Sequence, residues 1–438
     1  DEAALRYLAR LGQDSGDWKL ALAACERLLK LDLDDDSRLD YLHQIGRIYS
    51  EGLGDRVRAE RAYRTALDQL PTSDRALSAL IGFYEQAGDT RSMRVHLDRC
   101  IGAMRIRLAE NVRDGVAYRV IARALEARER VGVRGSLASA RCAAELALTA
   151  GFVGEGEDSL TTLAEQAAVA IPNVSGLEGE EVDEMLFPPA VSLHVRQLFA
   201  MLGDRVAKHV GIDLRRYGVG RGERLRRRED PVVAAAHEVA ALMGVDQVAL
   251  YVTSKEPILV ACEPTSPVSI ILGHELATAD RLVEVRFAVG RALKLIRSSL
   301  ALPARMSDDD FGVFIVALLR LFDEEFAVAG VDAGAVAGQL QRLRRLVPAG
   351  LAQQLAPYAR GVMGERFDHR AVRAAIHCAG DRAGLLTCGS MRASLRVVSG
   401  MRGFSDLGES LDDPRVAELV RFAVSKEHTV LRGMLDRE

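Results

Sequence analysis

Long hydrophobic runs, paired cysteines and a charge excess are all missing from this 438-residue sequence. No window approaches eighteen consecutive apolar residues, which predicts that no segment spans a membrane. The six cysteines are scattered, without a Cys-x-x-Cys pair, so we expect buried free thiols in a reducing compartment, the cytoplasm. The 58 basic residues nearly balance the 62 acidic ones, which gives no reason to expect nucleic acid or an anionic membrane as a partner.

What remains is the composition of an ordinary globular protein, 48% hydrophobic and 27% charged, with enough chain for two or three domains. Lysine occurs at only six positions while arginine is abundant, which indicates a GC-rich, bacterial genome. The sequence begins at Asp1 without methionine, so we expect a fragment of a longer protein whose upstream segment is not seen.

Three Gly-Asp pairs indicate an internal repeat in the first 150 residues. They stand at Gly16-Asp17, Gly54-Asp55 and Gly88-Asp89, at intervals of 38 and 34 residues. Each pair is expected to end one helix and precede another, because glycine commonly follows a helix and aspartate commonly caps one. Repeats of this length are typical of stacked helical pairs.

Residues 1–150 resemble an array of tetratricopeptide (TPR) repeats. The positions that match the small, aromatic and helix-ending residues of that motif are Ala59, Tyr63, Ala66-Leu67 and Pro71. One extra residue falls in the Glu51-Gly52-Leu53 turn. The resemblance implies an α-solenoid whose concave groove binds a protein partner.

Aromatic residues of the array are candidates for contacts with that partner: Trp18, Tyr41, Tyr49, Tyr63 and Tyr84. The alternative is that they fill the core between the helices, which is the interpretation we prefer. The array favours a binding role in either case, because solenoids seldom carry chemistry of their own.

Residues 151–230 are predicted to connect the array to a third domain, 231–438, because a Gly- and Glu-rich run at 151–157 is typical of a boundary. Arg215-Arg216 and the Arg-rich run 221–230 form a local basic patch that could bind an acidic partner or a phosphate. A solvated linker is the preferred interpretation, since no aromatic residues interleave with the arginines.

The third domain is predicted to combine a small sheet with helices. A helix should run from Pro231 to Met243 and end at Gly244. Strands are predicted at 247–253, 258–262 and 267–272. Further helices are predicted at 284–297, 308–326, 334–346, 351–362, 389–398 and 412–435.

The helix at 284–297 resembles the zinc-binding helix of the HtpX-like and CAAX-protease-like gluzincin metallopeptidases. Phe287-Ala-Val-Gly290 matches the lead-in of that helix. The resemblance places His, Glu and His at the next positions, where this chain has Arg291, Ala292 and Leu295. Arginine accepts no proton, alanine has no acceptor and leucine has no lone pair, so these residues cannot hold zinc or activate water.

A second match lies at Asp381-Arg382-Ala383-Gly384-Leu385, within the family segment that carries the third zinc ligand. His377 stands at the ligand position. The resemblance implies that Asp381 orients ligands in active members. In this chain we expect Asp381 and Arg382 to be structural, with Arg291 or Arg382 as the ion-pair partner of Asp381.

These observations predict a mainly α chain, a TPR-like solenoid followed by an α+β zincin-like domain without catalytic residues, metal or cofactor. The leading hypothesis is a non-catalytic scaffold or adaptor in a bacterial assembly. One alternative is a hydrolase with relocated metal ligands, drawn from His274, Glu275, His369, His377 and Asp381. Another is a regulatory module whose cleft binds an extended peptide, which requires an exposed edge strand beside helix 284–297.

Overall fold

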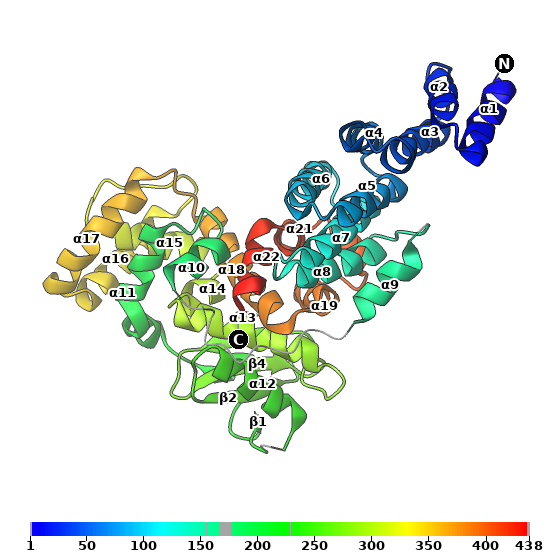
Figure 1. Ribbon diagram of the computed structural model, residues 1–438. Coiled ribbons are helices and arrows are strands. Elements are labelled where there is room, and N and C mark those ends of the chain that lie inside the picture. The colour runs from blue at the N-terminus through cyan, green and yellow to red at the C-terminus, as the bar shows by residue number, and fades with distance from the viewer. Residues whose placement is uncertain (1, 155, 167–176, 178, 228, 436–438) are drawn as a thin grey trace. The chain divides into compact units, whose positions relative to one another are not determined.

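The structure, a computed structural model, describes residues 2–154, 156–166, 177, 179–227 and 229–435, with the backbone alone at 204–210. The chain divides into two compact units, Asp1–Ala164 and Glu165–Glu438. The predicted connector is shared between them, and its residues 155, 167–176, 178 and 228 lie outside the described residues. The described chain is mainly helical, and its one sheet belongs to the second unit (Figure 1).

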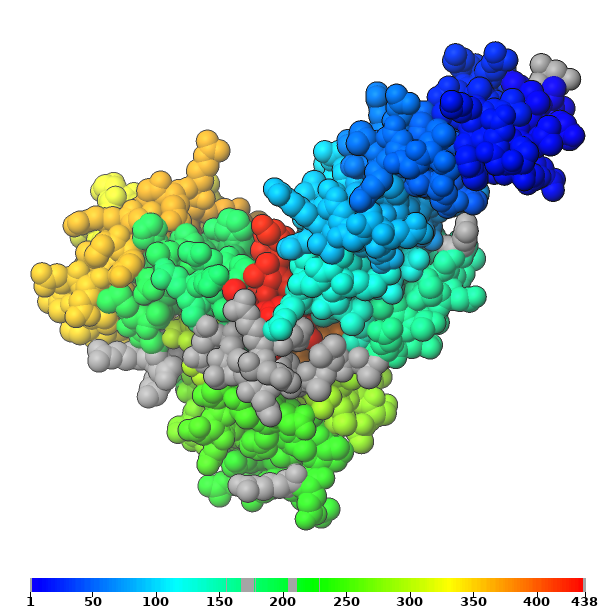
Figure 2. All heavy atoms as spheres, viewed as in Figure 1, coloured from blue at the N-terminus to red at the C-terminus, as the bar shows by residue number. Residues whose placement is uncertain are grey.

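Helices of the first unit follow one another in chain order (Figures 1 and 2). They are α1 Glu2–Ser15, α2 Trp18–Leu28, α3 Asp35–Arg47, the π-helical turn η1 Ile48–Gly52, α4 Arg56–Gln69, α5 Asp74–Ala87, α6 Thr90–Glu110, α7 Gly115–Arg130, α8 Ser136–Thr149 and α9 Glu157–Glu165. Neighbouring helices pack as hairpins, α1 on α2, α3 on α4 and α7 on α8.

Each predicted Gly-Asp pair joins two helices, as expected. The glycines are left-handed, with φ of 75° at Gly16, 67° at Gly54 and 63° at Gly88, a conformation that other residues rarely adopt. The next residue caps the following helix by accepting a backbone N–H at 3.0 Å: Asp17 from Leu20, Asp55 from Arg58 and Asp89 from Ser92. Each such cap stabilises its helix by about 1 kcal/mol.

The extra residue predicted at Glu51-Gly52-Leu53 falls in the π-helical turn η1, which holds more residues per turn than an α-helix. In the same hairpin, a Cβ added at Gly46 would lie 2.6 Å from the Tyr63 ring. Glycine at this position therefore lets α3 and α4 approach closely.

The second unit combines its sheet with many helices. Before and between the strands lie α10 Glu180–Leu186, α11 Leu193–Val210, the 3-10 turn η2 Leu214–Tyr217 and α12 Pro231–Leu242. After the sheet come α13 Leu282–Arg297, α14 Ala301–Arg305, α15 Asp308–Leu319, α16 Ala333–Leu346, α17 Ala349–Gly364, α18 His369–Cys388, α19 Met391–Met401, α20 Leu407–Ser410, α21 Pro414–Ala423 and α22 Lys426–Leu435. Of these helices, α12, α13 and α14 contact the strands. None of the helices in the described parts is long and apolar enough to cross a bilayer.

The sheet is small and mixed, in the order β1-β2-β4-β3. Its strands are β1 Arg224–Leu225, β2 Val248–Thr253, β3 Val260–Glu263 and β4 Val268–Gly273. β2 and β4 run parallel, with Val248 opposite Val268, while the other two pairs are antiparallel. The three longer strands lie where the sequence predicts them, whereas β1 is too short to leave a pattern.

Two predicted helices differ from the structure, one by ending earlier and one by being divided. The helix at 308–326 stops at Leu319, after which the chain turns and Arg320 Nε donates to the Phe326 carbonyl at 2.7 Å. The helix at 412–435 is divided into α21 and α22, because the Ser425 hydroxyl accepts the His428 N–H at 3.1 Å and caps a new helix.

Candidate functional site

Helices α13 and α18 pack against each other along their lengths and carry both stretches on which the expected metallopeptidase resemblance rests. Small residues allow this contact. A Cβ at Gly384 would lie 2.8 Å from the Phe287 ring, and a Cβ at Gly290 would overlap the Thr387 side chain. The close approach places Arg291 of α13 against α18.

The buried Arg291 and Asp381 form one group with the half-buried His377 and Arg415, called the Arg291 cluster below. Arg291 Nε donates to Asp381 Oδ1 at 2.8 Å. Arg415, from α21, donates to the same carboxylate twice, from Nε to Oδ2 at 2.5 Å and from Nη2 to Oδ1 at 2.8 Å. The Asp381 side chain is fully buried and that of Arg291 is 5% exposed. One carboxylate therefore binds two arginines from two helices through strong, charge-assisted bonds.

His377 completes the cluster as a neutral acceptor. Arg291 Nη2 lies 2.9 Å from His377 Nδ1. Because a guanidinium can only donate, Nδ1 accepts and the ring proton lies on Nε2. Burial, and then the positive charges of Arg415 and Arg291, lowers the pKa of His377 well below its ordinary value of 6.5. The ring is therefore uncharged at pH 7.

The four positions that the resemblance assigns to zinc chemistry offer little to a metal. Ala292 is 0% and Leu295 1% exposed, and both belong to the apolar core. Arg291 is a cation, and the Nδ1 lone pair of His377 is already bound to it. Zinc sites need several free lone pairs around one point. The arrangement supplies ion pairs between helices instead.

Two neighbouring cations have partners of their own. Lys294 Nζ lies 2.5 Å from Asp183 Oδ1 of α10. Arg382 binds Glu418 of α21, with Nε to Oε1 at 3.0 Å. The expectation that Asp381 has Arg291 as its partner is met, whereas the alternative partner, Arg382, is wrong, because consecutive residues of a helix do not face each other.

The alternative metal-binding set does not assemble. His274 and Glu275 lie in the turn after β4, whereas His369, His377 and Asp381 belong to α18. His369 and Asp381 stand twelve residues apart on that helix, about 18 Å along its axis. Within the described residues, no group of three or more His, Cys, Asp or Glu side chains is placed to hold a metal ion. The prediction that at least three of these five residues converge around a metal is therefore wrong.

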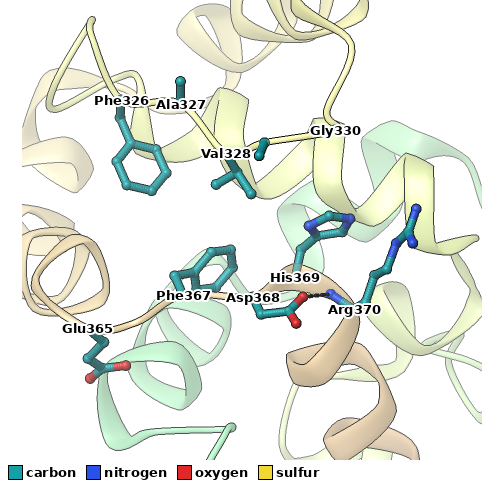
Figure 3. A pocket seen from close by; sticks show the side chains of 10 residues that line it. Phe326, Ala327, Val328, Gly330, Glu365, Phe367, Asp368, His369 and Arg370 are labelled. Carbon is teal, nitrogen blue, oxygen red and sulfur yellow. Dashed lines mark hydrogen bonds between the residues drawn. The ribbon is translucent and has the colours of Figure 1, made fainter.

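His369 lines a separate cavity of about 570 Å³, between the loop after α15 and the start of α18 (Figure 3). Phe326 and Val328 point into it from one side, and Phe367 and His369 from the other. His369 is 6% exposed, and its Nδ1 has no hydrogen-bond partner in the described structure. The Asp368 carboxylate is occupied in capping α18. The lining is thus mixed: Glu365, Asp368 and Arg370 stand beside the apolar side chains, and one histidine nitrogen has no partner among the described residues.

Strand β3 is the end strand of the sheet and lies beside α13 and α14. Three of its four residues, Val260, Cys262 and Glu263, are buried. Burial raises the pKa of the Cys262 thiol to about 12, although the charge of Arg291 opposes this shift. Strand addition needs an exposed edge, and this burial disfavours the alternative in which an extended peptide binds here.

In the first unit, four of the five aromatic candidates for partner contacts belong to the core: Tyr41, Tyr49, Tyr63 and Tyr84, all at most 8% exposed. The Tyr84 hydroxyl donates to Glu60 at 2.9 Å, and its ring stacks on His96. The preferred interpretation, that they fill the core between the helices, is confirmed for these four, and the alternative that they contact a partner is wrong, because neighbouring helices cover the faces that carry them. Trp18 is half-buried, with its ring against Gly52.

A different part of the array is open. A cavity of about 530 Å³ is lined by α3, α5, α7 and the loop after α8, and is called the array cavity below. Arg119 lines it almost fully buried, with Nη1 2.9 Å from Asp74 Oδ1 and Nη2 donating to the Thr72 carbonyl at 2.6 Å. Val153, another lining residue, is 80% exposed. Sequence reasoning missed this site because its residues come from helices far apart in the chain.

Comparisons with protein-family models, with curated proteins and with solved structures found no match to this chain. What the protein does has therefore to be inferred from its own geometry.

Proposed function

We propose that the chain is a non-catalytic protein-protein interaction scaffold, a TPR-like helical array joined to an inactive, zincin-like unit. The observation that carries this proposal is the Arg291 cluster. Arg291 stands where the resemblance places a zinc-binding histidine, and it binds both Asp381 and His377. A fixed positive charge at that point repels a divalent cation, while its ion pairs make it part of the core.

The cluster also gives the altered positions a structural purpose. The single carboxylate of Asp381 joins α13, α18 and α21 through Arg291 and Arg415. Removing one partner of a buried ion pair leaves an uncompensated charge and is strongly destabilising. We infer that the unit is maintained by these contacts as a rigid module, while binding is the task of the array.

The array cavity is the surface that supports partner binding best. It combines an apolar side chain, the exposed Val153, with the ion pair between the buried Arg119 and the half-buried Asp74. A partner covering Val153 would bury apolar surface next to fixed hydrogen-bonding groups, as binding sites commonly do. All six cysteines are free and buried, as expected from the sequence, which supports the cytoplasm as the place of this interaction.

Metal analysis of the purified chain tests the absence of catalysis. We expect far less than one equivalent of zinc and no peptide hydrolysis that a chelator suppresses. One equivalent of bound zinc together with chelator-sensitive hydrolysis would show that the second unit is an enzyme and that the proposal is wrong.

Partner binding can be tested with two substitutions in the full chain. Val153→Asp places a charge in the array cavity, and Val57→Asp places one on α4 outside it, at sites that are 80% and 79% exposed. We expect proteins that the unaltered chain captures from its host lysate to be lost with Val153→Asp and retained with Val57→Asp. If both variants retained these proteins, the array cavity would not be the partner-binding surface.

A further inference from the structure

A cavity in the second unit gathers three arginines from three separate elements. It has a volume of about 450 Å³, within the usual range of small-ligand sites. Its basic residues are Arg216 of η2, Arg305 of α14 and Arg342 of α16. The apolar part of the lining comes from Met306, Val313 and Phe314, and the only carboxylate among its lining residues is that of Asp310. It is called the arginine cavity below.

Arg305 is held in place by a buried network. Its Nη1 donates to both oxygens of Glu263, at 2.7 and 2.5 Å, and its Nη2 donates to the Gly211 carbonyl at 3.0 Å. The side chain of Glu263 is fully buried and also accepts from the Tyr217 hydroxyl at 3.1 Å. The Arg216 guanidinium lies 5.2 Å from the Tyr217 ring. Two of the three arginines are thus positioned by one connected set of contacts.

The charges of the other two arginines are not compensated. Glu263 neutralises Arg305, but in the described parts of the chain neither Arg216 nor Arg342 has a carboxylate partner. Asp310 accepts a hydrogen bond from the Ser307 hydroxyl at 2.7 Å, at the start of α15. Like charges that converge on one cavity repel each other unless an anion lies between them.

We propose that the arginine cavity binds an anionic group, phosphate or carboxylate, that is carried on an apolar body. Guanidinium groups match both anions with paired, charge-assisted hydrogen bonds. The Phe314 side of the cavity would cover the apolar body, and Gln339 offers a further polar contact in the lining. Arg216 belongs to the Arg215-Arg216 patch of the sequence, so part of that patch is a wall of the cavity. The site lies within the second unit and does not depend on partner binding by the array.

The test is a titration of the full chain with four probes, phenyl phosphate, benzoate, inorganic phosphate and phenol. Arg216→Gln/Arg342→Gln removes both uncompensated charges, which are exposed and make no structural ion pair. Arg215→Gln/Arg345→Gln is the matched control, because it removes two exposed arginines from the same elements without altering the lining. Thermal unfolding of both variants checks that they fold.

We expect phenyl phosphate or benzoate to bind the unaltered chain more tightly than inorganic phosphate or phenol. Whichever of these two probes binds more tightly identifies the preferred anionic group, phosphate or carboxylate. Binding should weaken at least about tenfold in Arg216→Gln/Arg342→Gln and by less than about twofold in the control, whose charges lie outside the contact range. Equal weakening in both variants, or no binding of either aromatic anion at millimolar concentration, would overturn the proposal. If inorganic phosphate bound as tightly as phenyl phosphate, the part of the proposal that gives the ligand an apolar body would be wrong.

Discussion

Removing the Asp381 carboxylate is the most informative perturbation of the Arg291 cluster. In Asp381→Asn, both Arg291 and Arg415 lose their charge partner while their side chains remain 5% and 18% exposed. Breaking a buried pair by removing one partner costs about 3–5 kcal/mol. Since one carboxylate serves two arginines, we expect the upper end, about 5 kcal/mol of unfolding free energy. That is a large share of the stability of an ordinary domain.

Arg291→Met is the matched comparison. It removes one cation, leaves both Asp381 oxygens bound to Arg415, and fills a similar volume with an apolar side chain. Because Asp381 keeps Arg415 as its compensating charge, no carboxylate is left unpaired, and we expect a cost below about 1.5 kcal/mol. The charge of the carboxylate, and not the volume of the arginine, should thus decide the stability.

Urea unfolding of the full chain separates the two units. Trp18 is the only tryptophan and lies in α2, so its fluorescence follows the first unit, while far-ultraviolet circular dichroism follows both. In Asp381→Asn, a dichroism transition should move to lower urea while the Trp18 transition stays. Equal losses in the Asp381 and Arg291 variants, or a loss below about 1 kcal/mol in Asp381→Asn, would refute the reasoning about buried charge.

Three other outcomes follow from the same structure. The fold lowers the pKa of His377, so its stabilising contribution is present above the unfolded pKa near 6.5 and is lost as the pH falls below that value. The loss should approach about 1.4 kcal/mol per pH unit. In His377→Gln, the unfolding free energy measured in urea should therefore change less between pH 7 and pH 5. Gly290→Ala should destabilise by about 1–3 kcal/mol in thermal melts, because its Cβ overlaps Thr387. Gly338→Ala, with nothing within 4 Å, should be neutral or slightly stabilising. Ellman's reagent should find fewer than one reactive thiol in the native chain and six in denaturant, since all six cysteines are buried and free.

Features of the fold that rest on local chemistry could be predicted from the sequence. A glycine that must adopt positive φ and an aspartate that caps the next helix leave a signal two residues long, and Gly54-Asp55 has both properties. The three longer strands were likewise recovered from short apolar runs. These elements are set by residues that are neighbours in the chain.

Features that depend on contacts between residues far apart in the chain could not be predicted from the sequence. Arg415 binds Asp381 from 34 residues away, and Asp183 binds Lys294 from 111 residues away. No local sequence pattern indicates either pair. For the tyrosines of the array, the sequence favoured the core but left a partner surface open as an alternative, for a related reason. Whether Tyr63 is exposed depends on which helix covers its face, and periodicity does not state that.

The ion pairs of Arg291 need an explanation beyond stability, because apolar residues in place of a whole buried ion pair would often stabilise a core as well or better. We infer that the ion pairs fix how α13, α18 and α21 align, since only one placement of the helices lets Arg291 and Arg415 reach the same carboxylate. Arg291→Met should then unfold near the urea midpoint of the unaltered chain. Amide hydrogen exchange in α21 should nevertheless become faster, because Asp381 is no longer held by Arg291 and so fixes Arg415 of α21 less firmly. Unchanged exchange throughout α21 would mean that Arg291 contributes nothing to the alignment of these helices.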